Sequence, residues 1–264
     1  MQGPVYFQRD KIQVGELKGV FAGGPVQASL QVSQLETAPR LRFSLRGELQ
    51  ATDLPMPERW RTAFSGAVPY QGSGTLLNNE LHFKGDADLR QSRSALPAPL
   101  NWASGKGGNL TVQSHGNVAH RLQVNFKLPL GSAVLAWQRE ESVWRWEAGA
   151  ARLGGEIPPP LPSTGFFLQG SGDSLSVGAW LNMLTGEEDR KTWPGIRFDL
   201  HWRHLRFLQQ DWPDVQIRGQ VAAKKLHLQC ASPRLAGVIH YARAPQPTAS
   251  AQLRLDIQKL SVAA

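Results

Sequence analysis

Apolar and polar residues alternate along most of this 264-residue chain. The clearest case is residues 120–128, where every second side chain from position 122 onward is apolar: Leu122, Val124, Phe126 and Leu128. Successive side chains of a β-strand point to opposite sides of the sheet. A period of two therefore predicts a strand with one apolar face and one polar face.

The same alternation predicts fifteen strands, separated by short turn signals. Their ranges are 11–15, 26–33, 41–50, 74–77, 80–89, 109–114, 121–128, 133–139, 143–151, 165–171, 197–208, 215–222, 225–231, 235–242 and 251–258. One turn is specific: Asn78 and Asn79 predict a tight hairpin, because Asn tolerates a positive φ.

Two segments depart from the strand pattern. Residues 174–185 place apolar side chains at helical spacing, with Asp173 or Ser174 as the expected N-cap and Gly186 as the end. Residues 54–64 predict one short helix after Pro57. The proline-rich residues 154–162 predict an extended connection.

The chain is therefore expected to be all-β, with one or two short helices that are too few to cover a large sheet. Three architectures fit: a β-sandwich, a closed barrel, or one long antiparallel sheet curled into an open, repeating β-groove whose apolar face is covered by a ligand. The pattern alone favours the sandwich, the usual solution for strand-rich chains.

We expect residues 1–264 to form one continuous segment of a larger protein, with a module junction, if there is one, near residues 90–108. The N-terminus lacks a charged start followed by an apolar run, so no signal peptide is predicted. No stretch reaches the roughly 18 consecutive apolar residues of a membrane-spanning helix. Targeting and anchoring segments are expected to lie outside this sequence.

Composition narrows the choice of partners. The net charge is +8 and the pI about 10.0, which suits nucleic acid, anionic headgroups or acidic polymers. The basic residues are scattered singly on the polar strand faces with no run of five, so nucleic acid is not expected. The single Cys230 falls on an apolar strand face, which predicts a buried thiol.

Catalytic and metal-binding signatures are missing from the sequence, so an enzyme, a cofactor or a metal is not expected. His201 and His204 are three residues apart on one predicted strand. That spacing points them to opposite faces, which argues against a shared metal ion. The nine Trp residues leave a carbohydrate-binding β-sandwich open, in which Trp137, Trp144 and Trp146 stack on sugars.

Five segments in order carry a family resemblance. They are Gly19-Val-Phe-Ala-Gly-Gly-Pro25, the strand and proline-rich exit 88–100, residues 172–184 with Trp180-Leu-Asn-Met-Leu184, the strand 196–208 followed by Trp212-Pro-Asp-Val, and Arg234-Leu-Ala-Gly-Val-Ile-His-Tyr241. In this order they resemble the YhdP branch of the AsmA-like superfamily, from about Val14 to Leu260.

The resemblance implies a fold and a role. Proteins similar to YhdP are envelope proteins of Gram-negative bacteria, anchored in the inner membrane, that cross the periplasm as a repeating β-groove. They are implicated in moving phospholipid toward the outer membrane and in outer membrane integrity. The expected partners are phospholipid acyl chains and, through parts outside this sequence, the two membranes.

Given that resemblance, the apolar rows of the strands are the candidate lipid contacts. They are Val26, Ala28, Leu30 and Val32; Leu41, Phe43 and Leu45; Leu122, Val124, Phe126 and Leu128; Ile196, Phe198, Leu200 and Trp202; and Leu253, Leu255 and Ile257. The main rival is a closed sandwich that serves as a structural or interaction module of an envelope scaffold, in which these residues form a dry core.

Overall fold

The structure is a computed structural model, and it describes residues 4–34, 37–54, 58–176, 179–180, 195–207, 210–222, 225–242 and 252–261. The strands are β1 Val5–Gln8, β2 Lys11–Phe21, β3 Gly24–Ser33, β4 Arg40–Gln50, β5 Phe64–Ser65, β6 Ala67–Leu77, β7 Glu80–Asp88, β8 Arg93–Ser94, β9 Asn109–Asn117, β10 Arg121–Leu128, β11 Gly131–Glu140, β12 Val143–Leu153, β13 Gly165–Ser176, β14 Ile196–Phe207, β15 Gln210–Ala222, β16 Lys225–Ala231, β17 Leu235–Ala242 and β18 Gln252–Leu260. The short helices are η1 Ala51–Asp53, α1 Glu58–Arg61 and η2 Leu89–Gln91.

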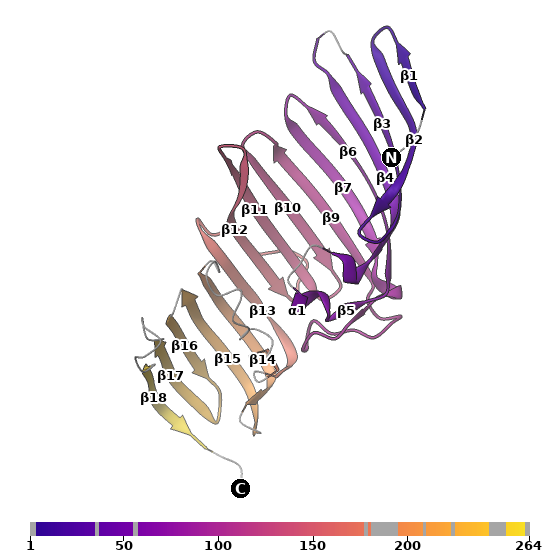
Figure 1. Ribbon diagram of the computed structural model, residues 1–264. Coiled ribbons are helices and arrows are strands. Elements are labelled where there is room, and N and C mark those ends of the chain that lie inside the picture. Colours follow the sequence, from indigo (N-terminus) through magenta and orange to yellow (C-terminus); the bar gives the residue numbers. More distant parts are fainter. Residues whose placement is uncertain are drawn as a thin grey trace. The chain divides into compact units, whose positions relative to one another are not determined.

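Sixteen of these strands form one sheet in chain order from β1 to β18, and β5 and β8 form a separate two-stranded sheet (Figure 1). The two end strands, β1 and β18, are not neighbours in that order, so the sheet is open. The all-β open sheet expected from the sequence is confirmed. The described strands do not form the two facing sheets of a sandwich.

The sheet is mixed rather than antiparallel throughout. Pairs from β1 to β10 and from β14 to β18 are antiparallel, whereas β12–β13 and β13–β14 are parallel. A parallel pair needs a connection that returns to the starting end of the first strand. The proline-rich residues 154–164 make that return between β12 and β13, where Ser132 Oγ donates to the Gly155 carbonyl at 3.1 Å.

The structure tests the predicted turn and the two predicted helices. The hairpin at Asn78 and Asn79 is confirmed, with φ values of 50° and 67° and Leu77 paired to Glu80. The short helix after Pro57 is α1. The N-cap prediction is wrong, because Asp173 and Ser174 lie in β13, which runs on to Ser176. Ala179 and Trp180 are helical, and the rest of that predicted helix lies outside the described residues.

The chain divides into two compact units, and the division falls within β11 and β12. Unit 1 comprises Met1–Leu96, Leu100–Pro129 and Val134–Trp146, and unit 2 comprises Pro97–Pro99, Leu130–Ala133 and Glu147–Ala264.

In unit 1, the elements η1, α1, β5, η2 and β8 gather at one end of the sheet, where β4 and β7 finish and β6 and β9 begin (Figure 1). We call this group the cap. Backbone hydrogen bonds stabilise the cap. The Ala51 N–H donates to the Gly66 carbonyl at 3.2 Å, and the Leu89 N–H donates to the Gly108 carbonyl at 2.8 Å. The buried apolar residues of this end are Val26, Ala51, Val68, Leu89 and Leu96.

Unit 2 has its own hydrophobic core. The buried cluster consists of Leu200, Trp202, Leu205, Trp212, Val215, Ile217 and Cys230. Strict alternation would place Trp212 and Val215 on opposite faces, yet both are buried. Both belong to one buried cluster, and Asp214 between them has a φ of 52°, so the backbone of β15 departs from regular strand geometry there.

Candidate functional site

The strand register of unit 1 collects its apolar residues on one face of the sheet. One row across six strands pairs Leu30 with Phe43, Phe43 with Gly74, Gly74 with Phe83, Phe83 with Ser114, and Ser114 with Val124. Directly opposed residues share a face. We call this the apolar face of unit 1. The neighbouring rows are Leu41, Leu76, Leu81, Gly116 and Leu122, and Leu45, Gly72, Gly85, Val112 and Phe126.

All candidate residues on β3, β4 and β10 therefore lie on this one face. Along each strand they alternate with polar residues that point the other way. The register also adds residues that the candidate set omitted, among them Leu81, Phe83 and Val112. Leu81 and Phe83 lie in a segment whose alternation was visible in the sequence, and Ile12 and Val14 on β2 join the face through pairing with Val32 and Leu30.

Little covers the apolar face along the middle of the strands. Leu30, Phe43, Phe83, Val124 and Phe126 are all half-buried, which is what contact with neighbours on the same sheet provides. Among the described side chains of this face, Val26 and Val68 at the cap end are buried, at 8% and 6% exposed. Toward the first strand exposure rises, and Phe7 is 76% exposed. Within the described residues this face is an open apolar surface.

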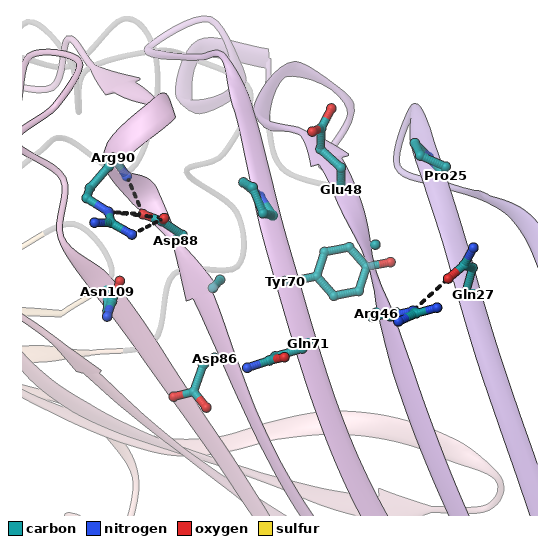
Figure 2. Close-up of a pocket in the computed structure, with 13 residues that line it drawn as sticks. Pro25, Gln27, Arg46, Glu48, Tyr70, Gln71, Asp86, Asp88, Arg90 and Asn109 are labelled. Carbon is teal, nitrogen blue, oxygen red and sulfur yellow. Dashed lines mark hydrogen bonds and ion pairs between the residues drawn. The ribbon is translucent and has the colours of Figure 1, made fainter.

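The opposite face of unit 1 is polar. Three hollows of about 550, 640 and 640 Å³ lie between its long side chains. The first is lined by Arg46, Glu48, Asp86 and Asp88 among others, and in it Arg46 Nε donates to Gln27 Oε1 at 2.6 Å (Figure 2). These hollows hold polar and ionic contacts, so they do not extend the apolar face.

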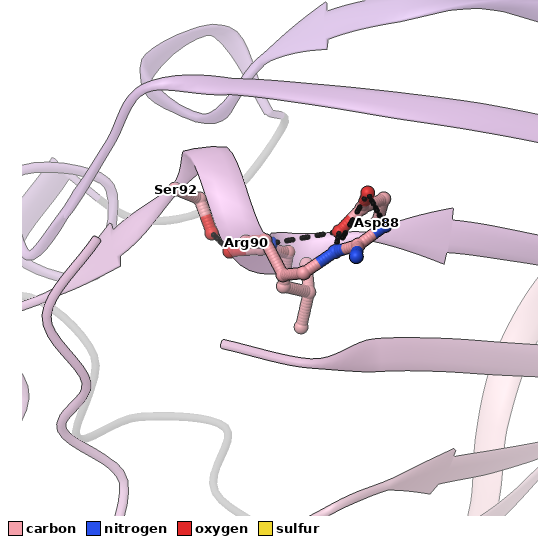
Figure 3. A network of polar contacts seen from close by, with 4 residues as sticks. Asp88, Arg90 and Ser92 are labelled. Carbon is pink, nitrogen blue, oxygen red and sulfur yellow. Dashed lines mark hydrogen bonds and ion pairs between the residues drawn. The ribbon is translucent and has the colours of Figure 1, made fainter. Parts of the chain in front are cut away.

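One charge-assisted contact holds the junction between β7 and η2. Asp88 accepts from the Arg90 backbone N–H at 2.9 Å and from Arg90 Nη2 at 2.7 Å (Figure 3). The side-chain hydrogen bond from Arg90 is the main cause that lowers the pKa of Asp88 to about 2, with the backbone hydrogen bond second. Ser92 Oγ donates to the Leu89 carbonyl at 2.8 Å and closes the turn.

In unit 2 the candidate residues also share a face, but they differ in accessibility. Phe198 opposes Gly219 and Leu200 opposes Ile217, and the same rows continue through β16 and β17 to Leu255 and Ile257. Ile196 and Phe198 are half-buried, and Leu255 and Ile257 are 51% and 55% exposed.

Other candidate residues of unit 2 have less surface that a ligand could contact. Leu200 is 9% exposed and Trp202 is fully buried in the core cluster, so Trp202 presents no surface to a ligand in this structure. Leu253 pairs with Tyr241 through the backbone, and its side chain is outside the described residues.

His201 and His204 each lie next to an acidic side chain. His201 Nε2 lies 2.7 Å from Asp214 Oδ1, and His204 Nδ1 lies 3.3 Å from Asp211 Oδ2, so each pairs with its own carboxylate. No group of three or more His, Cys, Asp or Glu suited to a metal ion occurs among the described residues. Cys230 is buried, as expected, and burial raises the pKa of its thiol.

These features define an all-β protein built on one open sheet whose strands carry an apolar face and a polar face. No helix in the described part of the chain is long and apolar enough to cross a membrane. The family model described as YhdP protein matches residues 1–264, and the chain belongs to that family, a lipid-transport branch of the AsmA-like superfamily. No curated protein and no solved structure matches the chain.

Proposed function

We propose that this chain is a segment of a periplasmic lipid conduit, along whose apolar face phospholipid acyl chains move between the inner and outer membranes. The observation that carries the proposal is the apolar face of unit 1, which is in register across β1 to β10 and half-exposed along the middle of its strands. Membership of the YhdP family supports the same role.

The energetics favour such a surface. An acyl chain of about 16 carbons has roughly 13 kcal/mol of apolar transfer free energy, at about 0.8 kcal/mol per CH₂. Crossing water uncovered is therefore prohibitive, whereas moving from one apolar row to the next exposes little additional hydrocarbon. No catalytic residue is required. Charged headgroups remain in water, where scattered Arg and Lys side chains attract phosphate.

The proposed contacts are the accessible members of the candidate set. In unit 1 they are Ala28, Leu30, Val32, Leu41, Phe43, Leu45, Leu122, Val124, Phe126 and Leu128, and in unit 2 they are Ile196, Phe198, Leu255 and Ile257. Val26, Leu200 and Trp202 are left out because their side chains are buried.

Site-specific photo-crosslinking in cells tests the proposal. A crosslinking residue at Phe126 or Phe198 is expected to capture phospholipid, whereas one at the adjacent Lys127 or Arg197, on the opposite face, is not. Each pair differs by one position, so expression and general lipid exposure are matched. Equal labelling of both faces contradicts a conduit on the apolar face.

Native mass spectrometry of the purified chain separates the alternatives. Bound phospholipid supports the conduit, and its absence supports a structural module of an envelope scaffold. A carbohydrate-binding function predicts instead that the chain binds glycans and that binding is lost when Trp137, Trp144 and Trp146 are replaced with Ala.

A further inference from the structure

Two histidines of unit 2 meet on its polar face, although they are 13 residues apart in the chain. His227 on β16 is directly opposite His240 on β17. Their Nδ1 atoms are 3.1 Å apart, and the ring centroids are 4.6 Å apart with a 49° tilt. Both residues are exposed, so the pair is accessible from water.

The separation of the two Nδ1 atoms suits a shared metal ion. Imidazole nitrogens bind Zn²⁺ at about 2.0–2.1 Å, which at a tetrahedral angle places two of them about 3.3 Å apart. At the right angle of a square-planar site they lie about 2.9 Å apart. We propose that His227 and His240 form a two-histidine site for a divalent transition metal ion, Zn²⁺ or Cu²⁺.

The residues around His227 and His240 determine how many protein ligands the ion would have. No third His, Cys, Asp or Glu completes a metal-binding group among the described residues, so water fills the remaining coordination positions and the ion exchanges with solvent. The neighbours in the same row are Gln220 and Arg254. Arg254 Nε lies 3.1 Å from both carboxylate oxygens of Asp256, which offsets its charge.

The proton balance is simple. In the metal-free pair one Nδ1–H donates to the other Nδ1. When both Nδ1 atoms bind the ion, the donating ring changes to its Nε2–H tautomer, and both imidazoles stay neutral.

A second histidine pair provides an internal control. His82 on β7 and His115 on β9 are also directly opposite and exposed on a polar face. The contacts of the described residues include none between those two rings. Cross-strand position alone therefore does not bring two imidazoles together, and the arrangement at His227 and His240 is specific.

The experiment uses the full chain without a polyhistidine tag. Calorimetric titration with Cu²⁺ is expected to show one ion per chain, and electron paramagnetic resonance is expected to show two equivalent nitrogen ligands. His227→Ala or His240→Ala should weaken binding about 10²-fold, because a second tethered donor adds about that factor. His82→Ala should leave it unchanged.

Thermal unfolding gives an independent readout. An ion that joins β16 to β17 raises the Tm of the wild-type chain and of His82→Ala, and leaves the Tm of His227→Ala unchanged. Circular dichroism establishes that each variant is folded. Equal Cu²⁺ affinity in the wild type and His227→Ala, or a spectrum with a single nitrogen ligand, overturns the proposal.

Discussion

Phe43 and Phe83 lie nearly parallel on the apolar face, with ring centroids 6.1 Å apart and an interplanar angle of 7°. They belong to β4 and β7, with β6 between them. Two glycines of β6 make the room: a Cβ at Gly74 would lie 2.5 Å from Phe43 Cζ, and one at Gly72 would lie 2.6 Å from Phe83 Cζ. The rings therefore lie across β6 and fill its glycine positions.

A methyl group at Gly72 should displace the Phe83 ring. We expect Gly72→Ala to destabilise the chain by about 1–3 kcal/mol, the usual effect of overpacking. Urea unfolding followed by circular dichroism measures the change. Ser73→Ala, the neighbouring position on the polar face, is the control and should change stability by less than about 0.5 kcal/mol. An equal effect of both substitutions would show that the rings do not occupy the glycine positions.

The difference between a buried and an open apolar side chain is testable on β14. Trp202 is fully buried, so Trp202→Ala should destabilise the fold by about 3–5 kcal/mol. Phe198, four residues earlier on the same strand, is half-buried and should give a smaller loss on replacement by Ala. Chemical denaturation of both variants decides the point. Equal losses would place Phe198 in the core of unit 2.

The Asp88–Arg90 pair predicts a pH dependence. The pKa of Asp88 is lowered to about 2 from an ordinary 3.8, so the carboxylate stays ionised in the folded chain below pH 3.8. The stability that this pair contributes is present above about pH 4 and is lost as the pH falls through about 2. Carboxyl NMR titration should give a midpoint near 2 for Asp88. In Arg90→Gln the midpoint should move toward 3.8, and an unchanged midpoint would rule out Arg90 as the cause.

Cys230 should be unreactive while the chain is folded. The residue is 7% exposed, and burial raises the pKa of its thiol, so both access and the thiolate fraction are low at neutral pH. Ellman's reagent should therefore react slowly in buffer and rapidly in denaturant. Rapid reaction in buffer would mean that the end of β16 opens readily.

The sequence predicted the strands well, because each one carries its own alternation of apolar and polar residues. The face shared by Leu30, Phe43 and Val124 also followed from the pattern, since a one-residue slip would expose a whole strand's apolar set. The same alternation could have added Leu81 and Phe83, which the candidate set omitted.

What escaped prediction depends on contacts between distant residues. The parallel pairs around β13 follow from where the connections run, which no local period encodes. Trp202 is buried in a cluster that joins residues of β14, β15 and β16, which no local pattern reveals. His227 and His240 meet only through the register of β16 and β17. Alternation predicts which face a residue takes, and the tertiary structure decides whether that face is covered.

A charge on the apolar face gives the most direct test of the proposed conduit. Phe126→Asp places a carboxylate among apolar neighbours. An acyl chain that moved past it would desolvate the carboxylate, which costs several kcal/mol. We expect phospholipid crosslinking at Phe43 and lipid-dependent outer membrane integrity to fall strongly in this variant.

Asn125→Asp is the matched control for Phe126→Asp. It adds the same charge one residue away, on the polar face, so it should leave both readouts near the wild-type level. Circular dichroism and thermal unfolding of both variants separate lost transport from lost folding. If the folded Phe126→Asp chain still captures phospholipid as well as Asn125→Asp does, the apolar face of unit 1 is not the path that the lipid takes.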